Sequence, residues 1–536
     1  MSTQLLLGGM VYSSPAVPDA TAMAVTDGTI VWVGSDDVGR ALHPDAEVVD
    51  LAGRFVSPAF VDSHVHLTDT GIALGGLNLS GATNRADCLQ QLAKYLATHD
   101  DDLVWGLGWD ASAWTGDAGQ DQPPTTSDLD AIAGDRPVYL ARIDEHSAAA
   151  SSALRRMVPD LQAENGFSAE QPLVADAHHR VRSTARNLMS PAIRQRARLR
   201  ALDYAASRGV VAVHENGGPD IGGLDDFRAI ADLNHGVSVR RYWGEAASST
   251  DEVKAILERT GADALGGDLF VDGALGSRTA WLTEPYADAA ASGISYLSEQ
   301  VILDHLRATT QLRVQAGFHM IGDAAAGVVA TALTILAEEL GTPALASCAH
   351  RLEHAEMVTQ EQAELFARCG AVASMQPLFD AAWGGPDDLY AARLGDRRTS
   401  LNNFAMLAKA GVGLSLSSDS PVCDIDPWAT IRAAAHHRTE ENSISPRAAF
   451  AASTRGGWRA AGINDGLTGT LVPGAPAHYA VWDVDELVVA ASTENVQRWS
   501  TDPRSRVPAL PAVDEDARLP ECVQTVANGQ QIFSRA

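Results

Sequence analysis

The sequence predicts an α/β protein: a (β/α)8 barrel of the TIM type, with a small β-sandwich domain built from both termini and an insertion after the first barrel strand. Three observations lead to this prediction. The chain has 536 residues, enough for a barrel with additions. Its middle alternates strand-like and helix-like runs, as βα units do. Both of its ends are rich in strand-like runs.

The barrel strands are predicted from short apolar runs in the middle of the chain. The clearest runs are residues 55–61, 210–214, 268–271, 312–318, 348–354, 371–375 and 412–417. Helix-like stretches such as 324–340 and 359–369 lie between them. In a (β/α)8 barrel the active site lies at the C-terminal ends of the strands, so polar residues that follow these runs are the candidates for function.

The two ends of the chain predict a separate β-domain. Near the N-terminus, Asp27-Gly28 is a good hairpin turn between two strand-like runs. We expect residues 1–56 and 470–536 to form one composite β-sandwich domain, and residues 57–469 to form the barrel. Residues 71–200 or so are less regular, and we expect them to be an insertion that covers the barrel mouth.

The composition excludes some partners. The formal net charge of −28 argues against binding to nucleic acid or to an anionic membrane. The five cysteines are scattered and show no metal-type spacing, which fits free thiols in a reducing compartment. We recognise no secretory signal and no apolar stretch of membrane-spanning length. The prediction is therefore a cytoplasmic enzyme with a small-molecule substrate, with a homodimer as a guess from size.

Two histidines, His64 and His66, end the first predicted barrel strand. Side chains alternate along a strand, so these two lie on the same face. Two imidazoles aimed at one spot are what a transition-metal site needs. On its own, the His-x-His pair is equally compatible with two unrelated polar residues at a strand end.

Three later strand ends strengthen the case for a metal. His319 follows the run 312–318, His354 ends the run 348–354, and Asp419 comes shortly after the run 412–417. Alternation places His350, Leu352 and His354 on one face of their strand and Glu353 on the other; His350 lies deeper and is expected to pack in the core. Together these strand ends supply up to five ligands at one face of a barrel.

These motifs resemble the metal-dependent amidohydrolase superfamily, and within it the YtcJ-like subfamily (amidohydrolase family 3), which includes N-substituted formamide deformylase. The resemblance covers nearly the whole chain. The matching segments are Val61-Asp-Ser-His-Val-His66, Gly209-Val-Val-Ala-Val213, Val271-Asp-Gly-Ala-Leu-Gly-Ser-Arg-Thr-Ala280, His319-Met-Ile-Gly-Asp323, Arg351-Leu-Glu-His354-Ala and Ser418-Asp419-Ser-Pro421. The predicted insertion also matches, in Gly108-Trp109-Asp110 and Asp144-Glu-His146-Ser.

The resemblance implies a role for each of these residues. His64, His66, His319 and His354 would be ligands of a divalent metal, most simply Zn²⁺, although iron and manganese also bind imidazole. Asp419 would contribute a carboxylate to the metal and act as general base toward the attacking water, then as acid toward the leaving nitrogen. His354 would assist catalysis.

One departure from the family pattern concerns the metal count. Many relatives carry a carbamylated lysine at the end of the fourth strand, which bridges two metals. The corresponding position here is Asp268, and none of the three lysines, Lys94, Lys254 and Lys409, lies at a motif strand end. Asp268 is a competent oxygen ligand, so the site holds either two ions bridged by this carboxylate or a single ion. We favour a single tightly bound ion.

Other residues are weaker candidates. Arg278, His146 and Trp109 are predicted to contact the substrate, although Arg278 is equally suited to a loop salt bridge and tryptophans are more often core residues. Trp105, Trp114, Phe379 and Trp383 hint at an apolar substituent on the substrate. His214-Glu215 is a candidate for supporting the metal ligands. The pairs His178-His179 and His436-His437 are expected to be solvated.

The sequence leaves three functional hypotheses. The first is a metal-dependent hydrolase of non-peptide carbon–nitrogen bonds, acting on a small amide or N-substituted formamide. The second is a metal-dependent deaminase of an amino-substituted ring, which the absent lysine makes more credible; release of ammonia distinguishes it from the first. The third is a non-catalytic binding protein on the same fold, which the complete ligand set disfavours.

Overall fold

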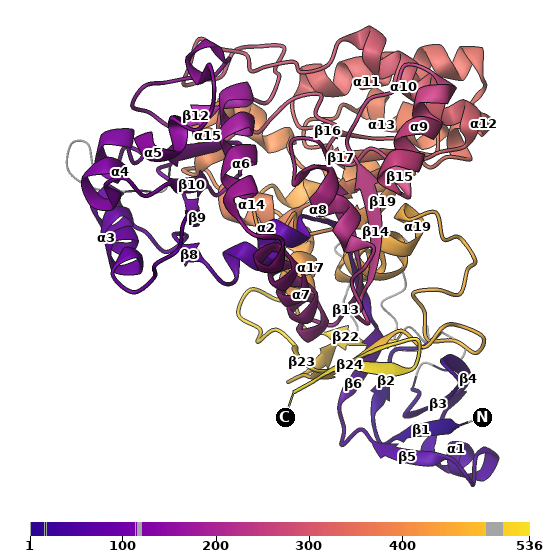
Figure 1. The fold of residues 1–536 in the computed structure, drawn as a ribbon. Coiled ribbons are helices and arrows are strands. Elements are labelled where there is room, and N and C mark those ends of the chain that lie inside the picture. The colour runs from indigo at the N-terminus through magenta and orange to yellow at the C-terminus, as the bar shows by residue number, and fades with distance from the viewer. Residues whose placement is uncertain are drawn as a thin grey trace.

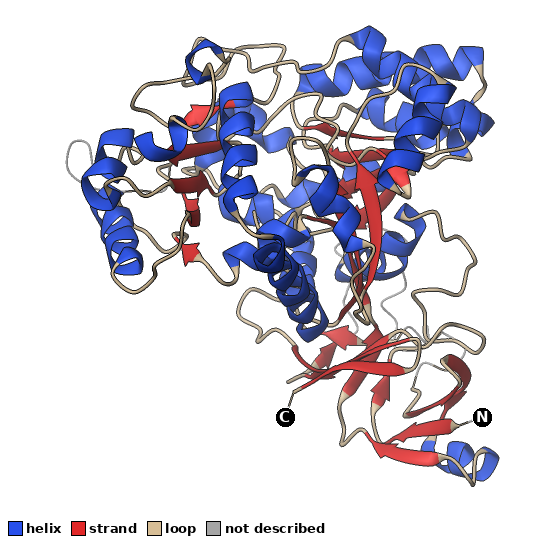
Figure 2. Cartoon of the chain, in the orientation of Figure 1, coloured by secondary structure: helices blue, strands red, loops and turns tan. Residues whose placement is uncertain are grey.

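The computed structural model describes residues 2–14, 17, 19–112, 114, 121–488 and 508–535. Figures 1 and 2 show three parts: a central α/β body, an insertion with its own sheet on one side, and a β-rich lobe below that contains both termini. The central body holds the largest apolar core. The described residues contain no helix that is both long enough and apolar enough to cross a membrane.

The central body contains two parallel four-stranded sheets. The first has the order β15-β14-β13-β7 and the second β16-β17-β18-β19. Their bounds are β7 Phe60–Val65, β13 Val210–Gly217, β14 Ser238–Trp243, β15 Ala264–Leu265, β16 Gly317–Met320, β17 Arg351–His354, β18 Val372–Met375 and β19 Gly413–Leu416. Isolated parallel bridges join the sheets at both sides: Val65 to Ser420 on one side, and Leu265 to Ala316 and Phe270 to His319 on the other. All eight strands therefore present their C-terminal ends in one direction.

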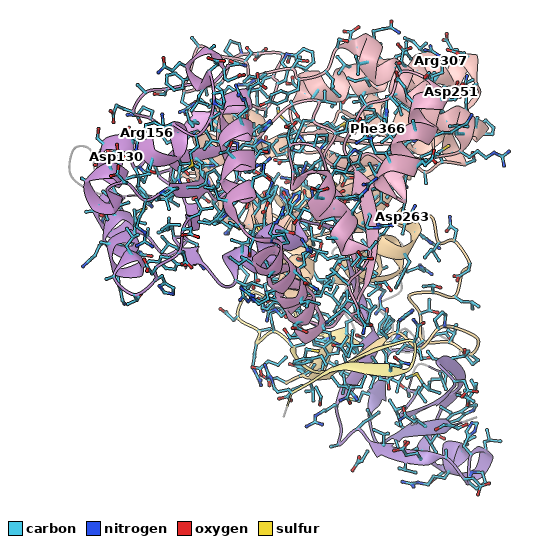
Figure 3. The ribbon with its side chains drawn as sticks, in the orientation of Figure 1. Asp130, Arg156, Asp251, Asp263, Arg307 and Phe366 are labelled. Carbon is cyan, nitrogen blue, oxygen red and sulfur yellow. The ribbon has the colours of Figure 1, made fainter. Side chains whose placement is uncertain are left out.

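Helices cover the outside of these sheets. They include α8 Gly223–Ile230, α9 Thr250–Thr260, α10 Glu299–Leu312, α11 Asp323–Glu339, α13 Gln360–Arg368, α16 Phe404–Ala410 and α17 Pro427–Ala435. Helix α13 begins with a capping box, in which the Thr359 hydroxyl and the Gln362 side chain bond each other's backbone N–H groups. In Figure 3, Phe366 of α13 lies inside the body, where it is fully buried, while Arg307 lies on the outer face of α10.

The insertion between β7 and β13 has a sheet of its own, with the order β12-β11-β10-β9-β8. Its strands are β8 Leu77–Asn78, β9 Val104–Trp109, β10 Val138–Arg142, β11 Ser147–Ala150 and β12 Leu173–Val174. Helix α6 (Ala175–Leu188) packs on one face of this sheet, and α3 (Arg85–Leu96) and α4 (Thr126–Ala133) pack on the other. The long helix α7 (Pro191–Ser207) leads back to β13.

The lobe that contains the termini has two sheets around a shared apolar cluster. One sheet has the order β4-β3-β1-β5, and the other has the order β2-β6-β20-β23-β24. The bounds are β1 Thr3–Leu7, β2 Met10–Val11, β3 Ala22–Thr26, β4 Thr29–Gly34, β5 Glu47–Asp50, β6 Phe55–Pro58, β20 Tyr479–Asp483, β23 Glu521–Ala527 and β24 Gln530–Ser534. The second sheet thus combines strands from both ends of the chain; the domain boundaries at residues 56 and 470 stay predictions.

Two predicted strands are placed wrongly. The run 268–271 is a loop: β15 ends at Leu265, and Gly266 and Gly267 with φ of 158° and 73° break the extended backbone before Asp268. The run looks like a strand because Leu269 and Val271 are buried in the central core. In the run 312–318, α10 extends to Leu312 and β16 begins only at Gly317.

An aromatic cluster joins the central body to the lobe of the termini. The Phe60 ring at the start of β7 meets the rings of Trp428 and Trp482 at centroid distances of 5.4 and 5.6 Å. The indole N–H of Trp482 donates to the Ser57 hydroxyl at 2.9 Å. All three rings are buried. Because β7 carries His64 and leads into His66, this cluster fixes the base of the strand that bears both histidines.

We predict that Trp482→Ala destabilises the protein by about 3–5 kcal/mol, because it leaves a cavity among three rings. Urea unfolding followed by circular dichroism measures the change. Trp482→Phe keeps a ring in place and should lose clearly less. A loss below about 1 kcal/mol for the alanine variant would show that the cluster repacks around the gap.

Candidate metal centre

The candidate ligands come from the C-terminal ends of strands on both sheets. His64 lies in β7, and His66 is the residue before α2 (Leu67–Ala73). His354 ends β17, Asp268 follows β15, and Asp419 follows β19. Parallel strands bring these chain segments to one edge of the body. The described residues contain two groups that could hold a metal ion, both including His64: one with Asp268 and His354, the other with His66 and Asp419.

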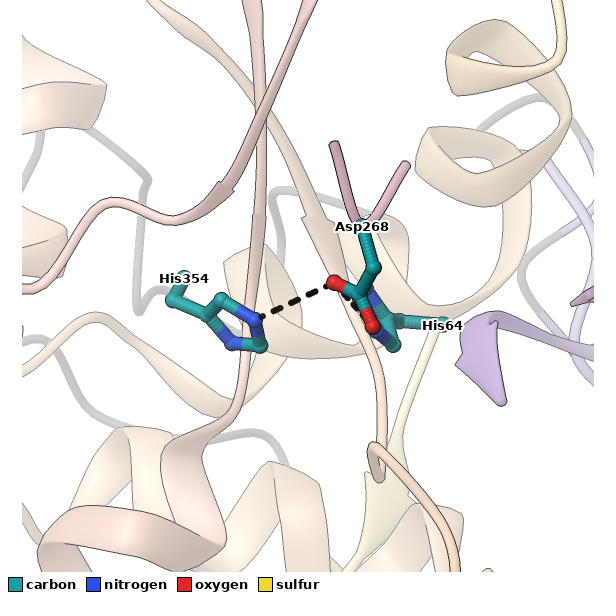
Figure 4. Close-up of side chains that lie close together, drawn as sticks. All are labelled: His64, Asp268 and His354. Carbon is teal, nitrogen blue, oxygen red and sulfur yellow. Dashed lines mark ion pairs between the residues drawn. The ribbon is translucent and has the colours of Figure 1, made fainter. Parts of the chain in front are cut away.

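The ring nitrogens and carboxylates converge closely (Figure 4). His64 Nε2 lies 3.4 Å from Asp268 Oδ1 and 3.3 Å from Asp419 Oδ1. His66 Nε2 lies 3.2 Å from an oxygen of each of the same two carboxylates. His354 Nε2 lies 3.7 Å from Asp268 Oδ1. Three imidazoles thus direct their Nε2 atoms at two carboxylates inside a buried space.

The opposite nitrogen of each ring has a hydrogen-bond partner. His64 Nδ1 lies 2.9 Å from Glu353 Oε2, and His66 Nδ1 lies 3.0 Å from the Asn216 carbonyl oxygen. His354 Nδ1 lies 2.8 Å from Gln376 Oε1. All three partners are acceptors, so each Nδ1 carries the proton and each Nε2 presents a lone pair to the centre. In known metal sites, a hydrogen bond from the other ring nitrogen of each histidine ligand fixes its tautomer and orientation in the same way.

The donor set fits a divalent cation. Four atoms that face the centre are buried without a hydrogen-bond partner among the described residues: His64 Nε2, His354 Nε2, Asp268 Oδ1 and Asp419 Oδ1. Buried polar atoms without partners are costly. Neutral imidazoles and carboxylates are good ligands for Zn²⁺ and related ions. One cation held by these atoms would satisfy all of them.

The electrostatics show that this centre attracts positive charge. Burial lowers the pKa of His64, but Asp268 and Asp419 outweigh burial and raise it to about 10. Burial raises the pKa of Asp268, but the neighbouring histidines, His64 first among them, hold it well below the usual range. The carboxylates of Asp268 and Asp419 therefore stay ionised and stabilise a positive charge beside them. That charge is carried either by a protonated imidazole or by a metal ion.

An unusual backbone conformation orients two of the candidate ligands, His354 and Asp419. His354 has φ of 68° and Asp419 has φ of 55°, both in the left-handed region. The Asp419 backbone N–H donates to the His64 carbonyl oxygen at 2.9 Å, which holds the two ligands together. At His354 the positive φ ends the alternation of β17. The predicted separation of His354 and Glu353 onto opposite faces is therefore wrong, since both contact the metal centre.

Glu353 continues into a buried chain of polar groups. Its Oε2 accepts a hydrogen bond from the Arg351 guanidinium at 2.7 Å. The same guanidinium donates to the Ser63 carbonyl oxygen at 2.6 Å and to His214 Nδ1 at 2.8 Å. It also lies over the Tyr242 ring, 4.4 Å from the centroid. Arg351 thus balances the Glu353 carboxylate and ties it to three strands of the body.

His319 lies beside the centre rather than in either ligand group. Its ring packs against those of His354 and Phe270, at centroid distances of 4.4 and 4.9 Å. Its Nδ1 is 3.5 Å from Asp272 Oδ1, and burial lowers its pKa to about 3. Asp272 in turn accepts three backbone N–H groups, from Trp281, Ile321 and Gly322. The neutral His319 ring therefore borders the centre, and its role as a ligand stays a prediction.

A small cavity of about 30 Å³ opens beside the centre. His319, His354 and Asp419 form its floor, and the insertion contributes Arg142, Asp144 and His146. An apolar wall faces them, formed by Leu275, Phe379, Trp383, Leu389, Tyr390 and Val422. A space of this size holds about two water molecules, so the surrounding side chains must move to admit a larger molecule. The predicted insertion therefore does supply part of the pocket.

Of the three predicted substrate contacts, the structure brings only His146 to the cavity. Its ring centroid lies 5.2 Å from that of His319. Arg278 is absent from the described residues that line the cavity, and its guanidinium pairs with Asp288 at 2.7 Å. Trp109 packs in the core of the insertion, where its indole N–H donates to the Leu140 carbonyl oxygen at 2.8 Å. The structure therefore places neither Arg278 nor Trp109 at this cavity, and their contact with a substrate stays a prediction.

Two histidine pairs also differ from expectation. His178 and His179 are buried, and the Tyr139 hydroxyl pairs with His178 Nε2 at 2.8 Å. They lie on α6, whose inner face packs against the insertion sheet. His437 is buried with Nε2 3.3 Å from Asp380 Oδ1, whereas His436, alone among these four histidines, is exposed as expected. His350 packs in the core as predicted, and its Nδ1 accepts the Ala316 N–H.

Sequence reasoning missed the partners of the ligand rings. Asn216 and Gln376 follow predicted strands directly, which was the available signal. Glu353 lies within the Arg-Leu-Glu-His motif but was assigned to the wrong face. Of the predicted supporting pair, Glu215 accepts the Leu67 backbone N–H at 2.7 Å, and His214 contacts Arg351.

Comparison with known proteins identifies the family. Residues 47–533 match the family model described as "Amidohydrolase family", Amidohydro_3. The chain belongs to this amidohydrolase family. It is accordingly a metal-dependent hydrolase that acts on carbon–nitrogen bonds, and the predicted resemblance and enzyme class are confirmed.

Several characterised or named proteins are similar to this amidohydrolase. "Protein LONG AFTER FAR-RED 3" of Arabidopsis thaliana is 28% identical, over 91% of this chain and 89% of its own length. "Putative amidohydrolase YtcJ" of Bacillus subtilis is 27% identical, over 82% and 84%. "N-substituted formamide deformylase" of Arthrobacter pascens is 25% identical, over 76% and 78%.

Solved structures agree with the fold. An uncharacterized metal-dependent hydrolase from Pyrococcus horikoshii has a TM-score of 0.69 and 25% identity, and the match covers 90% of this chain and 98% of that one. The central body of the amidohydrolase is therefore of the TIM-barrel type, as predicted at that level. The hydrogen-bonded strands that the structure describes form two sheets joined by isolated bridges.

We predict that Glu353→Gln lowers the affinity of the amidohydrolase for a divalent metal by about 10- to 100-fold. The amide cannot accept the His64 Nδ1–H and balance Arg351 as the carboxylate does. Isothermal titration of the metal-free protein with Zn²⁺ measures the affinity. Glu361→Gln, an exposed residue on α13, is the matched control and should leave the affinity unchanged. An unchanged affinity in Glu353→Gln would contradict a role in holding His64.

Proposed function

We propose that this amidohydrolase hydrolyses the carbon–nitrogen bond of a small amide or N-substituted formamide. The observation that carries the proposal is the apolar cavity wall, formed by residues such as Phe379 and Trp383, which faces the metal centre across a small cavity. When the side chains move apart to admit a substrate, an apolar N-substituent would contact that wall while the acyl group lies over the ligands. The similarity to a protein named N-substituted formamide deformylase supports this substrate class.

The residues of the centre would perform the reaction together. A divalent ion bound there would polarise the scissile carbonyl and lower the pKa of the attacking water. The Asp419 carboxylate takes a proton as the water oxygen bonds to the carbonyl carbon, and returns it to nitrogen as the carbon–nitrogen bond breaks. His354 lines the cavity beside Asp419, and a proton on its Nε2 would let it stabilise the developing negative charge on the carbonyl oxygen. The products are a carboxylate, formate in the simplest case, and an amine.

We further propose that the ion is Zn²⁺ and that one ion is bound tightly, by His64, His66, Asp268 and Asp419 with His354 assisting. These residues offer nitrogen and oxygen donors within a single small space, and Asp268 supplies both carboxylate oxygens to the histidines. Asp268 in place of a lysine excludes a carbamylated bridge. We also retain four proposals from the sequence: a closed eight-stranded barrel, a β-sandwich domain, a homodimer and a cytoplasmic location.

Deamination is the second candidate. It is favoured by Asp268, which stands where many relatives carry lysine, and by a centre whose donors suit a single metal. An amino-substituted ring would fit against the same apolar wall. Release of ammonia, rather than of formate or another carboxylate, would identify this activity.

We predict one equivalent of zinc in protein purified without chelator. His64→Ala should lose it, because His64 belongs to both ligand groups, whereas Asp268→Ala should retain it with weaker affinity. Elemental analysis measures the content of all three proteins. Two equivalents in the wild type, one of them lost in Asp268→Ala, would show that this carboxylate bridges two ions instead.

We predict that Asp419→Asn lowers kcat by about 10²- to 10⁴-fold, because it removes the group that transfers the proton. Aryl and alkyl formamides, N-acyl amines and cyclic amides are the substrates to screen, with formate, amine and ammonia as readouts. Glu361→Gln, whose carboxylate is exposed on α13, controls for loss of a charge. Fully metallated wild-type protein that is silent on every amide would refute the proposed function.

A further inference from the structure

Most of the charge in the cavity is already neutralised. Arg142 Nη1 lies 2.5 Å from Asp144 Oδ2, and Nη2 lies 2.5 Å from Asp110 Oδ1. Asp144 Oδ2 also accepts the Ser277 hydroxyl at 2.8 Å, and its Oδ1 accepts the His146 backbone N–H at 3.2 Å. These groups therefore have their partners within the protein and need none from a substrate.

Glu356 differs from them. It lies two residues beyond His354, lines the cavity, and is only 2% exposed. Its Oε2 atom has no hydrogen-bond partner among the described residues. Burial raises the pKa of the carboxyl against hydrogen bonds from the side chains of Tyr390 and Asn402, which lower it. Burial of a carboxylate oxygen without a partner is costly. The unpartnered oxygen thus marks a place where a group from outside the protein can bind.

The surroundings of Glu356 define what that group is attached to. The same cavity is lined by Phe379 and Trp383 of α14 (Pro377–Trp383) and by Leu389 and Tyr390 of α15 (Leu389–Leu394). Phe379 and Trp383 pack against each other at a centroid distance of 5.0 Å. When the side chains move apart to admit a substrate, these rings would contact a flat apolar group whose polar tip points at Glu356.

We propose that Glu356 selects substrates whose apolar N-substituent carries a second hydrogen-bond donor, a hydroxyl or an amino group. This inference rests on the proposed function for the reacting amide, and it adds a second point of recognition. A site built to bond a substrate hydroxyl or amine discriminates strongly against the analogue without it, because the buried acceptor is then left unpaired.

The main chain of Glu356 has a structural role that is separate from its side chain. Its backbone carbonyl oxygen accepts the Asn402 N–H at 2.9 Å, which ties the loop after β17 to the segment before α16. Substitution of the side chain leaves that bond intact. The side chain can therefore be changed to test recognition separately from loop structure.

The test compares N-benzylformamide with its 3-hydroxy, 4-hydroxy and 4-aminomethyl derivatives on the zinc-loaded protein. Wild-type enzyme should prefer at least one donor-bearing derivative by about 10- to 100-fold in kcat/KM, as expected when a buried acceptor is otherwise left without a partner. In Glu356→Leu this ratio should fall to about 3-fold or less. Glu361→Leu removes a similar carboxylate from the exposed face of α13 and should keep the wild-type ratio.

Two further measurements keep the outcomes distinct. Zinc content and circular dichroism show whether the Glu356→Leu protein folds. If Glu356→Leu does not fold, the comparison uses Glu356→Gln, which keeps a hydrogen-bond acceptor. Calorimetry with Asp419→Asn protein gives the dissociation constants of the same four compounds without turnover. If wild-type enzyme hydrolyses none of the four compounds, the proposed function fails. The inference about Glu356 is then decided by binding alone: the preference for donor-bearing compounds, given by their dissociation constants, is compared between Asp419→Asn protein with Glu356 and the same protein with Glu356 substituted.

The inference is overturned if no donor-bearing compound is preferred by the wild type in turnover or in binding. It is also overturned if the preference persists in a folded Glu356→Leu protein. A preference that disappears with Glu356 alone supports it.

Discussion

The structure depends on holding two buried carboxylates, Asp268 and Asp419, among three imidazole rings. These groups come from strands of both central sheets, so the centre also links the two halves of the body. Carboxylates in a buried space stay charged only when positive charge is beside them. The pKa of His64 rises and that of Asp268 falls for this reason. A divalent cation at this centre would balance the charge of the two carboxylates and would supply the metal chemistry of the family.

A chain of buried hydrogen bonds extends from the metal ligands into the interior of the central body. Glu353 holds His64, Arg351 holds Glu353, and Arg351 in turn lies against Tyr242 and His214 in the interior of the body. Loss of one partner from a buried ion pair typically costs about 3–5 kcal/mol, since the other charge is left unpaired. The polar interior therefore restricts His64 to one orientation, and the ligand is ready before the metal binds.

Sequence reasoning succeeded where one rule sufficed. Parallel strands place their C-terminal ends together, so His64, His66, His354 and Asp419 could be expected at one centre. The rule of alternation failed at His354, because a left-handed φ turns its side chain toward the face of Glu353. The strand predicted over residues 268–271 failed for a different reason, since two glycines end β15 before Asp268. Both departures depend on backbone conformations that apolar patterning does not reveal.

Tertiary contacts explain the remaining differences. Trp109 belongs to a motif of the family, but its side chain packs in the core of the insertion. His178 and His179 look solvated in sequence, yet α6 buries them against the insertion sheet. Glu356 had no signal at all, because its significance comes from aromatic residues on two later helices and from an oxygen that lacks a partner.

Anomalous X-ray diffraction at the zinc absorption edge, from crystals of protein purified without chelator, tests the central claim most directly. The account predicts one dominant peak among the Nε2 atoms of His64, His66 and His354 and the carboxylates of Asp268 and Asp419. Active protein whose crystals show no anomalous peak at this position, at the zinc edge or at those of iron and manganese, would contradict it.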